Sequence, residues 1–163
     1  MGLKKEFKEA VEAVVTLDWD HIEGTACNMF ETTIRYLGGL LSAYDLSREP
    51  LLLAKAVELG DMLYAGFDTP NHMPPFRFSF EKAKKGGLVP NDNQPVASAT
   101  TLSMEFTRLA RLTGNSKYYD AIARVIDRLF DNWNITKLPG MWLAFFDLKT
   151  ASSTTTIPSH SAL

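Results

Sequence analysis

Residues 30–44 read Phe-Glu-Thr-Thr-Ile-Arg-Tyr-Leu-Gly-Gly-Leu-Leu-Ser-Ala-Tyr, and they hold the most informative pattern of the chain. Two adjacent glycines, Gly38 and Gly39, cost a helix about 1 kcal/mol each relative to alanine. Their presence predicts that another element packs closely against this part of the chain. The apolar side chains of the stretch recur at the spacing of an amphipathic helix, which we expect from about Met29 to Tyr44. They are Ile34, Leu37, Leu40 and Leu41.

The beginning of this helix carries the residues of greatest chemical interest. Asn28 and Glu31 have the spacing of a capping box, and Arg35 follows Glu31 one helical turn later on the same face. A carboxylate beside an arginine at a helix N-terminus tends to stay ionised. The pattern has two interpretations: an ordinary helix cap with a surface ion pair, or a functional carboxylate that an arginine orients.

Further helical patterns lie on both sides of this segment. Leu46-Ser47 and Leu112-Thr113 precede helices 66 residues apart, and Asp61 and Asp127 match at the same offset. Repeated helix pairs are typical of a solenoid or a closed toroid of helices, although two amphipathic hairpins can also resemble each other by chance. The expected helices are Leu3–Val15, Pro50–Phe67, Val96–Leu112 and Lys117–Trp133.

The remaining segments show no helical period. Residues 68–93 are rich in proline and glycine and are expected to form a long irregular connection. Phe76–Phe80 alternates as a strand does, but it is short and follows two prolines, so we expect no strand there. The Ser- and Thr-rich tail from Lys149 is expected to be disordered.

The bulk composition is that of one globular domain. Of the 163 residues, 45% are hydrophobic and 22% are charged, and the net charge is −2, so a nucleic-acid partner is not expected. No apolar run is long enough to span a membrane, and the first residues do not form a secretory signal. The single cysteine, Cys27, excludes an internal disulfide and is expected to pack in the core.

The run Phe30–Tyr44 closely resembles a signature of the class I α-1,2-mannosidases, glycoside hydrolase family 47. Two further segments are similar to the same family: Ala56–Asp61 with Ala65–Pro70, and Leu102–Gly114. The resemblance covers roughly residues 1–150. It implies an all-α fold, a partial (α/α)7 barrel built from helical hairpins.

The resemblance also implies an activity: calcium-dependent hydrolysis, with inversion, of terminal α-1,2-linked mannose on high-mannose N-glycans. Glu31 would be a catalytic acid acting on the leaving oxygen, directly or through a water, and Arg35 would hold the glycan. Ser98 stands where many relatives have a glutamate that contacts mannose. The family further implies a protein of the secretory pathway, in the endoplasmic reticulum or Golgi, or secreted.

The chain departs from the family in its length. The family's other catalytic carboxylates and the threonine that binds calcium have no counterpart here, so no metal ligand is expected within this chain. We expect residues 1–150 to be a partial catalytic domain, residues 151–163 to be a disordered or aberrant tail, and the chain alone to be inactive. Two alternatives remain open: a non-catalytic glycan-binding relative involved in glycoprotein quality control, and a helical-repeat scaffold.

Overall fold

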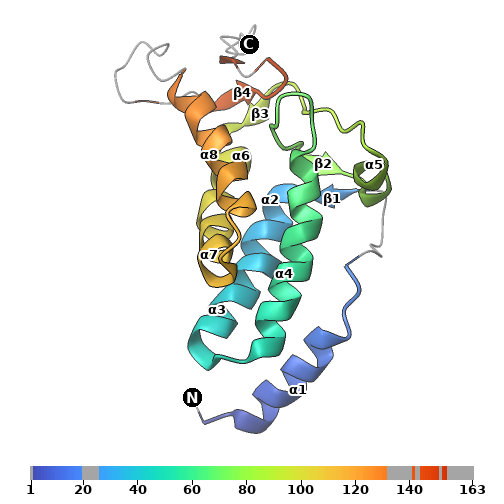
Figure 1. Ribbon diagram of the computed structural model, residues 1–163, viewed down its shortest axis with the longest axis vertical. Coiled ribbons are helices and arrows are strands. Elements are labelled where there is room, and N and C mark those ends of the chain that lie inside the picture. Colours follow the sequence, from blue (N-terminus) through green and yellow to red (C-terminus); the bar gives the residue numbers. More distant parts are fainter. Residues whose placement is uncertain (1, 20–25, 132–140, 142–143, 151, 154–163) are drawn as a thin grey trace, which may run out of the picture.

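The computed structural model describes residues 2–19, 26–131, 141, 144–150 and 152–153, and it is built mainly from helices (Figure 1). The expected helices are present with small changes at their ends. The helix expected over Val96–Leu112 is interrupted near Thr101, and the one expected over Lys117–Trp133 ends at Phe130. The helical elements are α1 (Lys4–Val15), α2 (Met29–Thr32), η1 (Thr33–Leu37), α3 (Gly38–Ser47), α4 (Pro50–Tyr64), η2 (Ala65–Phe67), α5 (Phe80–Lys85), α6 (Val96–Thr100), α7 (Ser103–Thr113) and α8 (Lys117–Phe130).

The helix expected over residues 29–44 is longer than predicted and contains a wide turn. Elements α2, η1 and α3 follow one another without a break, and η1 is a π turn. The backbone N–H of Gly38 donates to the carbonyl of Thr33, five residues earlier, which closes this turn. A π turn is rare and is frequent at functional sites. The apolar period of the sequence predicted the helix but gave no sign of the extra residue.

Two helical hairpins, α3–α4 and α7–α8, form the body of the chain (Figure 1). Each first helix ends in a residue with left-handed backbone, Arg48 with φ of 61° and Gly114 with φ of 70°. Their N–H groups donate to the carbonyls of Tyr44 and Ala110, which are again 66 residues apart. The two helix ends therefore have the same geometry.

The turns of the two hairpins repeat in their side-chain hydrogen bonds as well. The hydroxyl of Ser47 accepts from the N–H of Glu49, and the hydroxyl of Thr113 accepts from the N–H of Asn115. The side chains of Glu49 and Asn115 then each accept from the N–H two residues further on. The repeat that the sequence suggested is thus present in the turns of the two hairpins.

The two hairpins approach each other closely at Gly60 of α4. A Cβ atom at this position would lie 2.3 Å from Cδ2 of Leu109 and 3.6 Å from Cε1 of Tyr118. Both of those side chains are buried, and Tyr118 continues into edge-to-face contacts with Tyr64 and Phe106. The absence of a side chain at Gly60 therefore lets α7 and α8 join the core of the first hairpin.

Charged groups bridge the same two hairpins at their edges. Arg108 of α7 donates from Nε to Oδ2 and from Nη2 to Oδ1 of Asp45 on α3, at 2.9 and 2.5 Å. Asp61 of α4 accepts from the hydroxyl of Tyr118 at 2.5 Å and from Nζ of Lys117 at 2.6 Å. Burial alone would raise the pKa of Asp61, but the hydrogen bonds from Lys117 and Tyr118 outweigh it and lower the pKa.

Short strands close the end of the structure that lies opposite the α3–α4 turn (Figure 1). Strand β1 (Cys27–Asn28) pairs antiparallel with β2 (Arg77–Phe78), and β3 (Gln94–Pro95) pairs with β4 (Phe145–Asp147), which pairs with β5 (Ser152–Ser153). The expectation of no strand near residue 77 was wrong, because that strand forms through a distant partner that a local pattern does not reveal.

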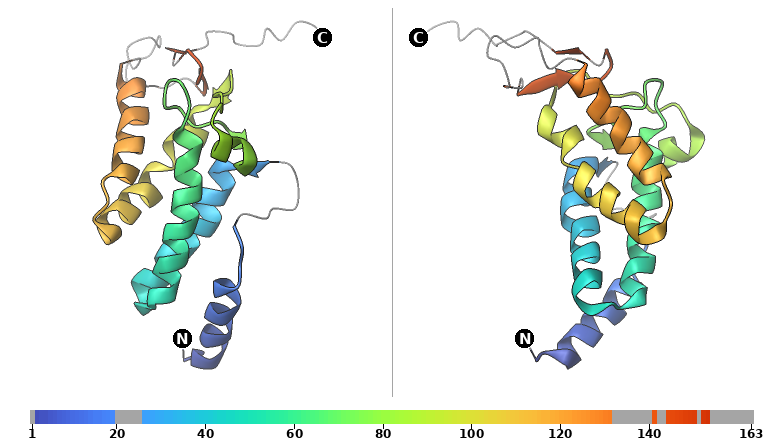
Figure 2. Two further views of the ribbon diagram at one scale, coloured as in Figure 1. Left: turned by 45° about the vertical axis from the view of Figure 1, so that its right-hand side comes forward. Right: turned by 60° about the vertical axis from the view of Figure 1, so that its left-hand side comes forward.

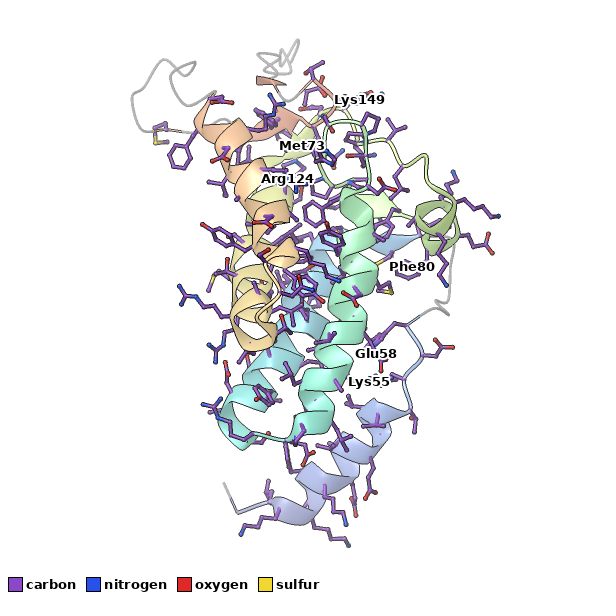
Figure 3. All side chains as sticks on the ribbon, viewed as in Figure 1. Lys55, Glu58, Met73, Phe80, Arg124 and Lys149 are labelled. Carbon is purple, nitrogen blue, oxygen red and sulfur yellow. The ribbon has the colours of Figure 1, made fainter. Side chains whose placement is uncertain are left out.

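The irregular connection also holds more structure than expected. Residues 80–85 form α5, with Phe80 buried (Figure 3). In the tail, residues 152–153 form strand β5, and the expectation of a disordered or aberrant tail stays a prediction. The other residues of 151–163 lie outside those that the structure describes, and the domain boundary at residue 150 stays a prediction.

Helix α1 is the least embedded of the described helices. Figure 2 shows it extending beyond the turn of the α3–α4 hairpin, and only Val11 among its residues is buried. The segment that follows α1 is bound to α4 by Lys55. The Nζ atom of Lys55 donates to the carbonyl of Leu17 at 2.8 Å and also pairs with Glu58 (Figure 3). Within the described part of the chain, no helix is long and apolar enough to cross a membrane.

We predict that Gly60→Ala destabilises the chain by about 1–3 kcal/mol, because the added methyl group must displace the buried Leu109. The matched control is Gly39→Ala, where a Cβ would meet no atom within 4 Å and alanine would favour the helix by about 1 kcal/mol. Urea denaturation at low protein concentration, followed by circular dichroism, measures both. A Gly60→Ala chain as stable as the wild type would contradict the close approach.

Candidate active site

The start of α2 is fixed from two directions. Asn28 has extended backbone, and its Oδ1 accepts from the N–H of Glu31 at 3.1 Å, as the capping-box spacing predicted. The N–H of Met29 donates to the carbonyl of Phe76, beside the β1–β2 pair. The helix therefore begins at a defined residue, and Glu31 lies in its first turn.

Glu31 and Arg35 form the ion pair that the sequence predicted. Nε of Arg35 donates to Oε2 of Glu31 at 2.5 Å, and the side chains of Arg35 and Glu31 are 69% and 41% exposed, respectively. An exposed helical pair of this kind contributes only about 0.3–0.5 kcal/mol to stability. Arg35 lies inside the π turn, so both groups stand on a solvent-facing part of an unusual helical turn.

Ser98 lies in α6, which packs against α2, the element that carries Glu31. The Ser98 side chain is buried at 7% exposure, and its hydroxyl donates to the carbonyl of Pro95 at 2.7 Å. The structure thus brings Glu31 and Arg35 into direct contact and places Ser98 on a neighbouring element. In this arrangement the Ser98 hydroxyl makes a hydrogen bond within the first turn of α6.

A further acidic residue, Glu105 of α7, was not singled out from the sequence. Its Oε2 atom is buried without a hydrogen-bond partner among the described residues. Its Oε1 atom faces the π-turn segment, because a Cβ on Gly38 would lie 3.3 Å from it. The sequence held one signal: Glu105 falls between Leu102 and Leu109 at the spacing of the buried face of the helix.

Burial raises the pKa of Glu105, because the charged form loses solvation and no cation compensates it among the described residues. The contact with Gly38 explains the first of the two glycines, where the sequence predicted close packing. The same prediction was wrong for Gly39, because a methyl group at that position would have no atom within 4 Å.

Cys27 is buried and its Sγ lies 3.2 Å from the hydroxyl of Thr32. Burial raises the pKa of the thiol, which the hydrogen bond with Thr32 only partly offsets. A thiol that resists ionisation is a poor nucleophile, so the expected packing role fits the structure.

The described residues do not fit a calcium site. No group of three or more His, Cys, Asp or Glu side chains comes together within the part of the chain that the structure describes. Calcium takes six to eight oxygen ligands, several of them carboxylates. We therefore assign no chemical step of this chain to the metal.

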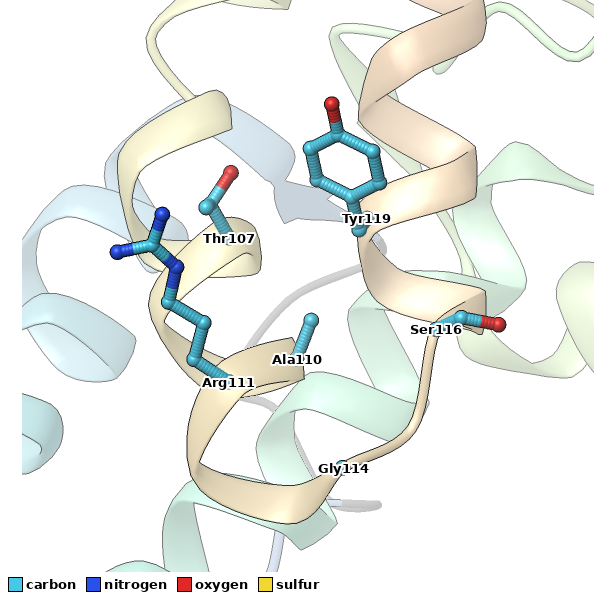
Figure 4. Close-up of a pocket in the computed structure, with 6 residues that line it drawn as sticks. All are labelled: Thr107, Ala110, Arg111, Gly114, Ser116 and Tyr119. Carbon is cyan, nitrogen blue, oxygen red and sulfur yellow. The ribbon is translucent and has the colours of Figure 1, made fainter.

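An open hollow of about 430 Å³ lies between α7 and α8, and Glu31 is not among the residues that line it (Figure 4). Its Arg111 has the same place in its hairpin as Asp45 has in the first hairpin, where Arg108 binds Asp45. The hollow thus corresponds to the face that the first hairpin presents to the second, and we interpret it as a packing face. It is lined by Thr107, Ala110, Arg111, Gly114, Ser116 and Tyr119.

Comparison with known proteins gives a consistent result. The glycosyl hydrolase family 47 profile matches residues 1–162. The endoplasmic reticulum mannosyl-oligosaccharide 1,2-alpha-mannosidase of Rattus norvegicus is 39% identical over 125 residues, which are 77% of this chain and 19% of that protein. Mannosyl-oligosaccharide 1,2-alpha-mannosidase MNS1 of Arabidopsis thaliana is 34% identical over 162 residues, which are 96% of this chain and 28% of that protein.

The structure of an alpha-1,2-mannosidase from Trichoderma reesei superimposes with a TM-score of 0.76 at 29% identity, covering 87% of this chain and 32% of that one. The profile match and the mannosidase relatives place the chain in a family of glycosidases. The chain belongs to glycosyl hydrolase family 47, and its hairpins are part of an (α/α)7 barrel. It spans less than a third of the length of these relatives.

We predict that Glu105→Gln changes stability in a pH-dependent way. Because burial raises the pKa of Glu105 in the folded state, its protonated form favours folding below the unfolded pKa, near the ordinary value of 4.5. That contribution is lost as the pH rises through the higher folded pKa. The glutamine chain should therefore match the wild type near pH 4 and be more stable than it near pH 7.

Urea denaturation midpoints of the two chains, measured at both pH values, provide the test. The same difference in midpoint at pH 4 and pH 7 would contradict a raised pKa for Glu105.

Proposed function

We propose that this chain is the Glu31-bearing part of a mannosyl-oligosaccharide 1,2-α-mannosidase, which hydrolyses terminal α-1,2-linked mannose on high-mannose N-glycans. The observation that carries the proposal is the Glu31–Arg35 pair, solvent-exposed at the start of the helix whose sequence resembles the family signature. Membership of family 47 and the mannosidase names of the relatives support it.

Glu31 is proposed as the catalytic acid. It would protonate the leaving glycosidic oxygen, directly or through a water. An inverting glycosidase places its acid and its base on opposite sides of the sugar, with space for the attacking water between them. The base is expected from a part of the family domain that this chain does not cover, and so are the ligands of the calcium ion. When bound, calcium would supply a positive charge that coordinates sugar hydroxyls and water.

Arg35 is proposed to bind the glycan and to orient Glu31. Its Nε already donates to Oε2 of Glu31. A guanidinium group carries five N–H donors in a fixed plane, so its Nη groups can meet sugar hydroxyls while Nε holds the carboxylate. Ser98 is proposed to influence which mannose branch is accepted, because α6 packs beside α2 and a serine there takes less space than a glutamate.

The proposed compartment is the secretory pathway, where N-glycans are trimmed. The name of the rat relative includes the endoplasmic reticulum, which favours that compartment for this chain. The Golgi and secretion are the alternatives.

We expect Glu31→Gln, in the complete protein that contains this chain, to lower mannose release from an α-1,2-linked mannobiose by about 10²–10⁴-fold. The amide keeps the shape of the side chain but cannot donate and accept the catalytic proton. Glu58→Gln is the matched control, since Glu58 is an exposed, paired glutamate on a neighbouring helix. Equal activity of wild type and Glu31→Gln would exclude Glu31 as the acid.

The isolated chain is expected to release no mannose, because it offers one carboxylate of the proposed pair. The same mannobiose assay, with the complete protein as positive control, tests this expectation, and a clear rate from the chain alone would contradict it. If the complete protein binds high-mannose glycan in the presence of calcium without turnover, the non-catalytic alternative replaces the mannosidase.

A further inference from the structure

The Glu105 carboxyl group lies at one particular point of the helix that carries Glu31 and Arg35. Its Oε1 atom faces Gly38, so closely that a Cβ there would be 3.3 Å away. Gly38 is the residue whose N–H closes the π turn by donating to the carbonyl of Thr33. The carboxyl group is therefore packed against the C-terminal end of the π turn.

The ionised form of this carboxyl group is disfavoured in the fold. Its Oε2 atom is buried and has no hydrogen-bond partner among the described residues, which is a costly state for an acidic group. Two arginines on α7 and in the π turn bind other groups: Arg108, one turn along α7, binds Asp45, and Arg35 binds Glu31. A buried polar group that is left unpaired in a native protein calls for another explanation, and an active site is the usual one.

Through its contact with the π turn, Glu105 can affect the geometry of Glu31 and Arg35. One extra residue in the turn rotates everything after it by about 100° relative to an unbroken α-helix. Such a turn persists only where surrounding contacts hold it, because it is less favourable than the α form. Arg35 lies inside the turn and Glu31 just before it, so their mutual geometry depends on what holds the turn.

We propose that Glu105 is a positioning residue for the Glu31–Arg35 pair, and that its buried carboxyl group braces the π turn through Gly38. Its Oε2 atom is closed to solvent, so the group is proposed to act through Arg35. Glutamine has the same shape and is uncharged, and it should brace the turn as glutamate does. Alanine leaves the space beside Gly38 empty and should not.

The first test uses the chain itself and does not depend on any activity. Hydrogen–deuterium exchange is measured over residues 33–38 and, as an internal reference, over α8. In Glu105→Ala we expect exchange in residues 33–38 to rise by about tenfold with α8 unchanged, and in Glu105→Gln no rise. Met104→Ala is the matched control, since Met104 is the preceding residue of α7 and is 75% exposed. Unchanged exchange in Glu105→Ala, or an equal rise in α8, would overturn the bracing role.

The second test rests on the proposed function and uses the complete protein. Glu105→Ala should lower kcat for mannobiose hydrolysis by about 10²-fold, and Glu105→Gln should restore it. The double variant Glu105→Ala/Arg35→Ala should be no worse than Arg35→Ala, because both changes disturb the same pair. Additive losses, or failure of glutamine to restore kcat, would overturn the inference, whereas an inactive wild type would overturn the proposed function and leave the exchange result standing.

Discussion

The close approach at Gly60 joins the second helical hairpin to the first, and other contacts between the hairpins accompany it. A methyl group of Leu109 occupies the space that any side chain at residue 60 would need, so the side chain of Leu109 on α7 lies against the backbone of α4. That approach brings Tyr118 beside Asp61 and, at the other end of the hairpin, Arg108 beside Asp45. Once α7 lies in this position, Glu105 also reaches the π-turn segment of the first hairpin.

Apolar packing and charged bridges have different tasks in this arrangement. Burying a side chain such as that of Phe106 contributes about 1.5–3 kcal/mol, whereas an exposed ion pair contributes about 0–1 kcal/mol. The cohesion of the hairpins therefore comes from their buried side chains. The bridges between Arg108 and Asp45, and between Lys117 and Asp61, add little energy but are geometrically demanding, so they select one register of the second hairpin on the first.

The sequence predicted the features that are local and missed those that depend on distant contacts. The hairpins, the Asn28 cap and the Glu31–Arg35 pair follow from spacing within one or two helical turns. The strand at Arg77 and the π turn do not follow from local spacing. The strand forms by pairing with β1, and the π turn is accompanied by the packing of α7 on Gly38. The sequence alone could have identified Glu105 as an acid on the buried face of its helix. It could not show that Glu105 faces Gly38 and the π turn. The roles of Glu31, Arg35 and Ser98 stay predictions.

Departures from what stability alone would select converge on one short segment. A carboxylate and an arginine stand exposed where they stabilise little, and the helix widens into a π turn. The Glu105 carboxyl group lies against that turn, with its Oε2 atom buried and without a hydrogen-bond partner among the described residues. The hollow beside Arg111, by contrast, has the place in the repeat that a packing face would have. Natural sequences break local rules mainly at functional sites. Three such departures lie on or against the segment Met29–Gly38, which supports the proposal that this segment carries the function.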